Sequence, residues 1–233
     1  MTPASDSRAA FTLMELLVVM AVLGVLATLL VPALAAGRAR ARAAACASNL
    51  RQIGVALQVY SDDNDGDFPH TTHGRPHTDS WVYTLGRYLA DIDRVRISPG
   101  DPRGAERLAA HGTSYVMNEY LTVPLETFGG VAEDYTNRRR LARPTDTFAA
   151  FIGADHLAPS VTADHTHSRA WPNGWSTVLA DIQPDRHRSG PAVPDRTRGT
   201  ANYLYADGHV LALAGTRLAE LHRATPDLAR PPE

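Results

Sequence analysis

A long apolar run near the N-terminus constrains the fold of this chain more than any other feature. Residues 11–36 carry a single charged side chain, that of Glu15. As a helix rising about 1.5 Å per residue, the run is long enough to cross a ~30 Å hydrocarbon core. A carboxylate near the start of a membrane helix is costly unless another group compensates its charge. The run therefore predicts a membrane-spanning helix in which Glu15 has a specific function.

The residues around Glu15 form a recognisable pattern. Residues 10–17 read AFTLMELL, they follow a short polar leader, and Pro32 lies further along the run. This pattern resembles the N-terminus of type IV pilins and type II secretion pseudopilins, the class III signal that prepilin peptidase reads. The resemblance implies cleavage between Ala10 and Phe11, methylation of the new amine on Phe11, and a role for Glu15 in subunit assembly. That family usually has Gly before the cut, so Ala10 predicts slower cleavage.

Cleavage would also explain how the membrane tolerates Glu15. It frees an α-amine at Phe11, about one helical turn from the carboxylate, within one subunit or between two. A charge pair in lipid recovers much of the cost that either charge carries alone. One alternative is a plain anchor with its acid at the interface, although a generic anchor has no need of this motif. Another is a secretory signal cut at the small residues 33–36, for which the apolar core is too long.

The helix is predicted to continue beyond the membrane. Pro32 removes one backbone hydrogen bond, and the resemblance implies that this region can unravel within a fibre, so Pro32 and Gly37 are predicted points of helix flexibility. Residues 37–60 are rich in Ala and lack proline. Their apolar side chains recur at helical spacing, which predicts an amphipathic helix lying on a domain. The stripe consists of Cys46, Leu50, Ile53, Leu57 and Tyr60.

These patterns divide the chain into four segments. They are a leader at 1–10, a transmembrane helix at 11–36, its amphipathic continuation at 37–60 and an extracytoplasmic domain at 61–233. We expect an α+β, pilin-like fold, in which the long N-terminal helix packs on a small antiparallel β-sheet with long loops. In the domain the sequence predicts a helix at 81–90 capped by Ser80, strands at 114–118 and 147–153, loops at 129–143 and 155–174, and a closing helix at 217–223.

The clearest local signal lies near the C-terminus. Asp207-Gly208 stands between two β-rich runs, which predicts a hairpin with a type I′ turn. Together with His187 and Asn202, it resembles the C-terminal signature of a prepilin-processing-associated domain, H-X9-DG. Here the His and the Asp-Gly are farther apart, as though residues 191–198 had been inserted. The simpler interpretation is a turn that His187 and Asn202 pin to the sheet by hydrogen bonds. The alternative is a polar cluster of His187, Asp207 and His209 that binds a ligand or a metal.

No cofactor is expected. The alternating acids of residues 61–67 are typical of a calcium loop. The EF-hand template does not fit them, because it needs Asp at the first ligand position and Glu at the last, where this chain has Ser61 and Thr72. A solvated helix stop is the better interpretation. Loop histidines offer a second, less favoured site for a transition metal, since such residues are more often exposed. They are His70, His73, His77, His165 and His167. No catalytic motif is present and the lone Cys46 lies on a packing helix, so we expect no enzymatic activity.

Charge gives conflicting information about topology. The net charge of −2 gives no sign of a nucleic-acid surface. Arg38, Arg40 and Arg42 follow the apolar run, and the positive-inside rule would keep the C-terminal side in the cytoplasm. The resemblance implies the opposite: a single-pass protein of the bacterial inner membrane with an extracytoplasmic C-terminal domain. It also implies three kinds of partner, namely prepilin peptidase, other pilin-like subunits and inner-membrane assembly proteins of a secretion or pilus system.

The sequence thus predicts a structural subunit, and a minor one, of a pseudopilus or type IV pilus-like fibre that serves secretion, adhesion or DNA uptake. The runner-up is a membrane-anchored extracytoplasmic ligand-binding module that does not polymerise. In that reading Trp171, Trp175 and the His-rich loops would contact glycans or a surface partner. A metal-dependent hydrolase is a third option, and it would require bound metal in the purified domain.

Overall fold

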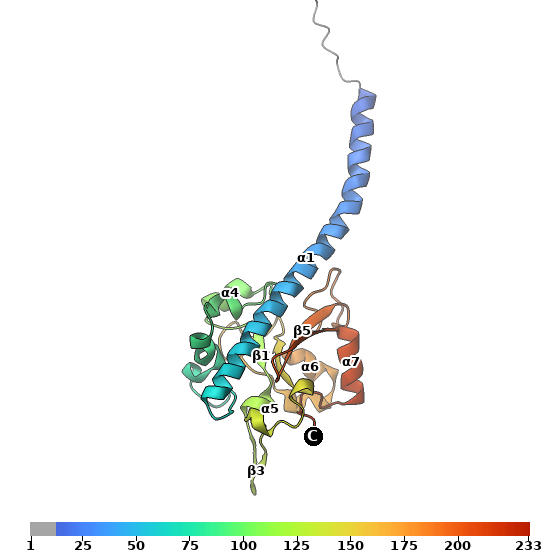
Figure 1. Ribbon diagram of the computed structural model, residues 1–233. Helices are drawn as coiled ribbons and strands as arrows, with labels where there is room; N and C mark the ends of the chain where they lie inside the picture. The colour runs from blue at the N-terminus through green and yellow to red at the C-terminus, as the bar shows by residue number, and fades with distance from the viewer. Residues whose placement is uncertain (1–12) are drawn as a thin grey trace, which may run out of the picture. The chain divides into compact units, whose positions relative to one another are not determined.

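Helix α1, Leu13–Asp63, is the longest element in the computed structural model, which describes residues 13–233 (Figure 1). It covers the described parts of both predicted helical segments without interruption. The predicted cleavage site, Ala10 and Phe11, lies outside the described residues. Contacts within the chain divide it into two units, Met1–Arg38 and Ala39–Glu233.

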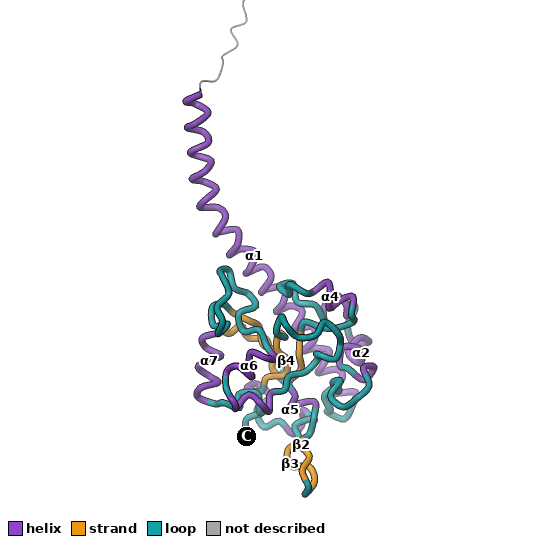
Figure 2. Tube along the Cα trace, turned by 180° about the vertical axis from the view of Figure 1, so that it is seen from behind, coloured by secondary structure: helices purple, strands orange, loops and turns teal. Residues whose placement is uncertain are grey.

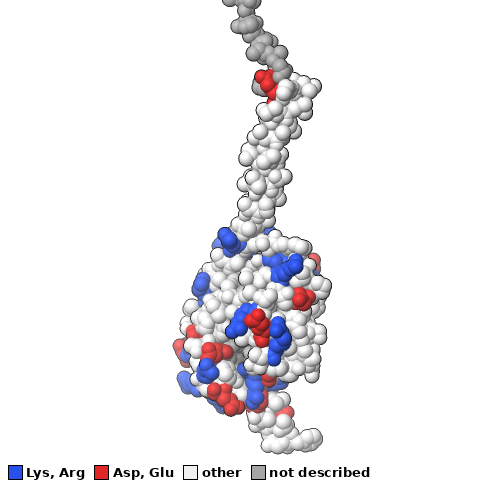
Figure 3. All heavy atoms as spheres, turned by 90° about the vertical axis from the view of Figure 1, so that its right-hand side faces the viewer, with Lys and Arg blue, Asp and Glu red and all other residues white. Residues whose placement is uncertain are grey.

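The first unit contains the apolar part of α1. Its large apolar side chains are exposed all round the helix; Leu13 is 77% exposed and Leu29 is 68% exposed. Figure 3 shows an almost uncharged surface along this part. Among the described residues, α1 is the one helix that is both long enough and apolar enough to span a membrane. A helix that is apolar on every side and not buried in the domain is suited to the hydrocarbon core of a bilayer.

From Ala39 onward, α1 belongs to the second unit and is amphipathic, as predicted. All five residues of the predicted stripe are buried, and Cys46, Leu50 and Ile53 are completely so. The helix stops where the sequence predicts, since Gly66 N–H bonds back to Ser61 O over 2.7 Å and Gly66 has a φ of +97°. The acid-rich segment therefore terminates a helix that packs on the domain.

Two antiparallel sheets form the β part of the domain (Figures 1 and 2). The larger sheet has the strand order β1-β4-β5-β6, and α1 lies against the face that carries Asn202 and Leu204 of β5. The opposite face carries Tyr203, which packs on Phe148 and Phe151. The smaller sheet is the β2–β3 hairpin. The strands are β1 Tyr115–Met117, β2 Leu125–Thr127, β3 Gly130–Glu133, β4 Phe148–Ile152, β5 Thr200–Tyr205 and β6 Val210–Ala214.

Short helices lie between α1 and β1, in the connections between later strands and after β6. The α-helices are α2 Trp81–Thr84, α3 Ile92–Val95, α4 Gly104–Ala109, α5 Glu119–Thr122, α6 Trp175–Asp181 and α7 Gly215–Ala224. Short 3₁₀ segments lie at His77–Asp79, Leu85–Tyr88, Arg138–Arg140, Pro144–Asp146 and Ser168–Asn173. The predicted closing helix at 217–223 is confirmed as α7.

Three predicted connections are wrong in detail. Ser80 caps a helix as expected, since its hydroxyl accepts from Val82 N–H over 3.3 Å, but that helix ends after one turn and continues as the 3₁₀ turn Leu85–Tyr88. The predicted loop 129–143 contains strand β3, because Gly130, with a φ of +108°, allows a tight hairpin. The predicted loop 155–174 contains the 3₁₀ turn Ser168–Asn173, which is held by the burial of Trp171.

Candidate functional site

The first candidate site is the N-terminal part of α1 around Glu15. Glu15 lies in the first turn of the helix, where the unpaired backbone N–H groups favour a negative charge. Met14, Val18 and Val19 line a hollow in the helix surface together with Glu15. The predicted partner of the carboxylate, the amine of Phe11, lies outside the described residues, so the role of Glu15 in assembly stays a prediction.

The predicted points of helix flexibility lie within a continuous helix. α1 runs through Pro32 and Gly37 without a break. A methyl group added at Gly37 would meet no atom within 4 Å, so packing within the chain does not require a glycine there. Flexibility at these two residues remains a prediction.

The second candidate site is the C-terminal motif, and its hairpin is confirmed as β5 and β6. The turn differs from the predicted type I′. Gly208 N–H bonds to Tyr205 O over 2.9 Å, Tyr205 N–H bonds to His209 O over 3.0 Å, and Gly208 has a φ of +91° while Asp207 does not lie in the left-handed region. The loop thus has three residues, with the left-handed conformation at Gly208 alone. The Asp207 carboxylate accepts from His209 N–H over 3.0 Å, which stabilises the turn.

This turn is docked on α1. Gln58 donates a side-chain hydrogen bond to the Asp207 carbonyl, and Asn202 Nδ2 donates to the Ala43 carbonyl over 2.7 Å. Between these contacts α1 carries Gly54, where an added Cβ would lie 2.8 Å from Leu204 Cδ1. A side chain on Gly208 would likewise collide with Gln58. The two glycines let the helix and the hairpin approach closely.

His187 and Asp207 lie at opposite ends of β5. His187 N–H bonds to Thr200 O, the first residue of the strand, whereas Asp207 follows its last residue. The alternative cluster of His187, Asp207 and His209 is therefore not assembled. His187 Nε2 lies 3.4 Å from Asn202 Nδ2, so these two residues do meet. The extra residues 191–198 leave the sheet between His187 and Thr200, and this is why the longer spacing leaves the hairpin intact.

The environment of His187 predicts a pH-dependent stability. Burial, helped by the adjacent Arg186, lowers the pKa of His187 to about 4. The unfolded chain binds a proton near its ordinary pKa of about 6.5, so stability is lost as the pH falls from 6.5 towards 4, by about 3 kcal/mol in all. We expect His187→Gln to flatten the dependence of the unfolding free energy on pH in this window. Denaturant titrations at a series of pH values would measure it.

The pH dependence of the natural protein must be compared with that of His187→Gln, because another histidine changes the unfolding free energy with pH in the opposite direction. The hydrogen bond that the His167 ring donates to Asp181 raises the pKa of His167, so its contribution to stability is present at low pH and is lost as the pH rises. That contribution is common to both proteins and cancels in the difference. An unchanged pH dependence in His187→Gln would contradict the assignment.

Gly208 offers a second test of the docked turn. We expect Gly208→Ala to lower the unfolding free energy by about 1–3 kcal/mol, because the left-handed conformation is strained for alanine and the methyl group meets Gln58. Gly190→Ala is the matched control, because its added methyl group has open space and its φ is ordinary. Thermal unfolding of the two variants would measure the difference. Equal stability would contradict the docking.

Two groups of polar residues were predicted as less favoured metal sites. Among residues 13–233 no group of three or more His, Cys, Asp or Glu side chains is arranged to hold a metal ion. The acids at the end of α1 and just after it have other partners, since Asp62 pairs with Arg138 over 2.5 Å and Asp67 accepts from Asn137 over 2.7 Å. The expectation that the protein has no cofactor remains a prediction.

Two of the loop histidines, His73 and His165, lie where two loops meet. His165 Nδ1 lies 2.8 Å from the buried carboxylate of Asp164, and its Nε2 lies 3.3 Å from His73 Nδ1. Asp164 also accepts from Ser80 Oγ over 2.6 Å and from Thr72 N–H. These contacts join the segment before α2 to the loop that borders β1.

The two tryptophans of the predicted ligand-binding surface differ in burial. Trp171 is completely buried, and its indole N–H donates to Asp181 Oδ2 over 2.7 Å. Trp175 is partly buried, packs on His222 and donates to Asp195 O over 2.9 Å. The prediction that Trp171 contacts a glycan is wrong, because its ring lies in the core against Phe151.

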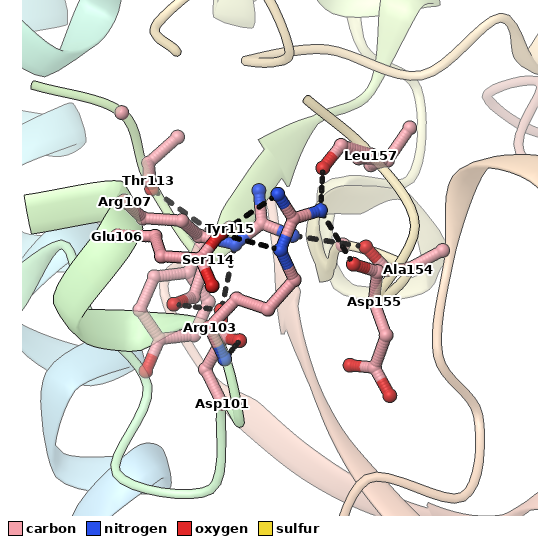
Figure 4. Close-up of polar contacts among 12 residues, drawn as sticks. Asp101, Arg103, Glu106, Arg107, Thr113, Ser114, Tyr115, Ala154, Asp155 and Leu157 are labelled. Carbon is pink, nitrogen blue, oxygen red and sulfur yellow. Dashed lines mark hydrogen bonds and ion pairs between the residues drawn. The ribbon is translucent and has the colours of Figure 1, made fainter. Parts of the chain in front are cut away.

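A buried ion pair is the main feature that the sequence did not reveal (Figure 4). The side chains of Arg107 and Asp101 are both fully buried, and Arg107 Nε lies 2.8 Å from Asp101 Oδ2. Ser114 Oγ donates to the same oxygen over 2.6 Å. The Arg107 guanidinium also donates to the carbonyls of Ala154 and Ala158, 3.0 Å away in each case. The pair joins α4 and the start of β1 to the segment after β4.

Two family models match the chain. The model of the prokaryotic N-terminal methylation motif matches residues 6–31, and that of a family described as protein of unknown function (DUF1559) matches residues 35–91. Both end before the C-terminal hairpin, so the resemblance of that hairpin to the H-X9-DG signature stays a prediction. No solved structure matches the chain.

Two curated relatives share the same description. The type II secretion system core protein G of Escherichia coli is 29% identical over 139 residues, which are 58% of this chain and 93% of the relative. That of Klebsiella michiganensis is 32% identical over 103 residues, which are 43% of this chain and 72% of the relative. The chain is therefore similar to these proteins over most of their length and carries additional residues of its own.

Proposed function

Since the chain belongs to the type II secretion system core protein G family, we propose that it is a structural subunit of a pseudopilus-like fibre. The observation that carries the proposal is the exposed apolar part of α1, with Glu15 in its first turn, inside the segment that matches the N-terminal methylation motif. Prepilin peptidase would release this helix from its leader. Packing of the freed helices side by side would then bury in the fibre the apolar surface that a single chain leaves exposed.

We propose a minor rather than a bulk subunit. The matched 139 residues make up nearly all of the E. coli relative but 58% of this chain. The domain also carries long connections, such as residues 191–198 and the β2–β3 hairpin. Specialised loops of this kind suit a subunit present in few copies.

The membrane placement follows from the same proposal. A single spanning helix would anchor the subunit in the bacterial inner membrane, with the domain on the extracytoplasmic side. The partners would be prepilin peptidase, other pilin-like subunits and the inner-membrane assembly proteins of the secretion system. The subunit is expected to have no enzymatic activity, since the sequence contains no catalytic motif.

Mass spectrometry of the mature N-terminus tests the proposal. In cells with active prepilin peptidase we expect the chain to begin at an N-methylated Phe11, and in cells without the peptidase to begin at or near Met1. Protein that keeps its leader while the peptidase processes another substrate in the same cells would overturn the proposal.

The unusual residue before the cut provides a matched variant. We expect Ala10→Gly to be processed faster than the natural chain, because glycine is the usual residue at that position in the family that the N-terminus resembles. A pulse-chase measurement of leader loss would compare the two rates. Equal processing of Ala10→Gly would show that the peptidase does not distinguish the two residues, and slower processing would contradict the expected preference for glycine.

A further inference from the structure

The outer edge of the larger sheet is open. β6 ends the sheet and pairs with β5 alone. Tyr205 N–H bonds to His209 O, and hydrogen-bonded pairs alternate along an antiparallel ladder. The backbone N–H and C=O groups of Leu211 and Leu213 therefore point to β5, and those of Val210, Ala212 and Ala214 point outward. Among the described residues, the outward groups of Val210 and Ala212 have no backbone or side-chain hydrogen-bond partner, whereas the Ala214 carbonyl accepts the first hydrogen bond of α7.

The opposite edge of the same sheet is covered. Met117 of β1 accepts from Thr166 N–H over 2.9 Å and donates to Asp164 O over 2.9 Å, so a neighbouring loop occupies that edge. Within residues 13–233 no loop pairs with the outer edge of β6, and the strand lacks the usual protection. It reads VLALA, without a charge or a proline, Leu211 is 44% exposed and Ala212 is exposed. Natural proteins rarely leave an edge of this kind unpaired.

The β2–β3 hairpin is the complementary element. It projects from the rest of the domain in Figures 1 and 2, and its surface is nearly uncharged in Figure 3. Phe128 at its tip is completely exposed, and Val131 on β3 is 59% exposed. Each of its strands has a single partner, so each keeps one open edge. The ion pair between Arg230 and Glu133, 2.7 Å long, anchors the base of the hairpin to the domain.

We propose that β6 of one subunit pairs with the β2–β3 hairpin of a second copy of this chain. β6 is short, apolar and open at one edge, and β3 is short, open at its outer edge and carries the apolar Val131 and Ala132 at its centre. Pairing satisfies the outward backbone groups of each strand and covers exposed apolar side chains. The two surfaces are different, so each copy keeps one of them for the next subunit, and the contact propagates along a filament instead of closing into a dimer. This inference rests on the proposed function, because it needs subunits that are adjacent in a fibre.

Cysteine crosslinking in the full-length, membrane-embedded protein tests the pairing. The double variant Ala212→Cys with Ala132→Cys, treated with a short bismaleimide, is expected to give a ladder of dimers, trimers and higher multimers. Each single variant is expected to remain monomeric. Cys46 is completely buried and so adds no background. Dimers from Ala212→Cys alone would show pairing of β6 with β6 and would overturn the proposal.

A third site separates failure of this inference from failure of the proposed function. Ala44 is exposed on α1 and belongs to neither strand, and Ala44→Cys reports on the packing of helices in the fibre. A ladder from Ala44→Cys without one from the double variant overturns the pairing and leaves the fibre proposal standing. No ladder from either overturns both.

A proline variant supplies an independent measurement. In Ala212→Pro the lost N–H points away from β5, so the ladder inside the sheet is kept and the domain is expected to unfold near the natural temperature. Crosslinking between Val210→Cys and Ala132→Cys is expected to fall about tenfold or more when Ala212→Pro is added. Unchanged crosslinking in a folded protein would overturn the pairing.

Discussion

Replacing Glu15 with alanine is expected to leave the chain in the membrane but to exclude it from fibres. Insertion depends on the apolar run, which loses its one charge and becomes more apolar. Assembly depends on the carboxylate, which would compensate the amine at Phe11 of a neighbouring subunit. An unpaired charge in the membrane costs about 2.5 kcal/mol or more, which corresponds to roughly a seventyfold loss of incorporation. The measurement is the ratio of protein in sheared fibres to protein in membranes.

The controls for this prediction use neighbouring residues. Met14→Ala changes the same helix surface without a change of charge, so it is expected to assemble normally. Glu15→Asp keeps the charge and should retain part of the incorporation. Should Glu15→Ala enter fibres as well as Met14→Ala does, the carboxylate has no part in assembly.

Replacing Arg107 with alanine is expected to have the largest effect on folding. The substitution leaves the buried carboxylate of Asp101 without its cation and also removes donors from two backbone carbonyls. Breaking a buried pair from one side costs about 3–5 kcal/mol, which is a large part of the 5–15 kcal/mol that stabilises a typical domain. Denaturant unfolding of the full-length protein in detergent, followed by near-ultraviolet circular dichroism, would measure the loss.

An exposed pair on the same domain is the control. Arg217 and Glu220 lie 3.3 Å apart on α7 with side chains that are 60% and 53% exposed, so Arg217→Ala is expected to cost less than about 1 kcal/mol. A comparable loss in both variants would mean that burial does not distinguish the pairs, contrary to the role assigned to Arg107.

The elements that the sequence predicts well are those with strong local signals. α1 follows from an apolar run and from a stripe at helical spacing, both visible within a few turns of the chain. The β5–β6 hairpin follows from Asp207-Gly208 between apolar runs. The turn type did not follow, because Ala206 lies inside the loop and makes it three residues long. β2 and β3 have no alternating pattern, since both faces of that hairpin are largely exposed.

The site residues divide in the same way. Glu15 stands out because a charge in an apolar run is visible in the sequence alone. Gly54 does not stand out, because a glycine within a helix gives no indication that a hairpin presses against it from about 150 residues away. Arg107 is one of 23 basic residues, and its burial depends on Asp101 and on two carbonyls more than 40 residues further along the chain. Contacts of this length leave no trace in local composition.

The docking of the hairpin on α1 sets a limit on how far such a subunit can stretch. Each residue that passes from helix to extended chain gains roughly 2 Å of length. If the helix unwinds from Pro32 to Arg42 when the fibre is pulled, each subunit gains roughly 20 Å of length. Beyond that point the contact of Ala43 with Asn202 and the contact of Gln58 with Asp207 must first be broken. We therefore expect the filament to extend easily at first, while the helix unwinds, and to resist further extension strongly once the contacts between α1 and the hairpin carry the load.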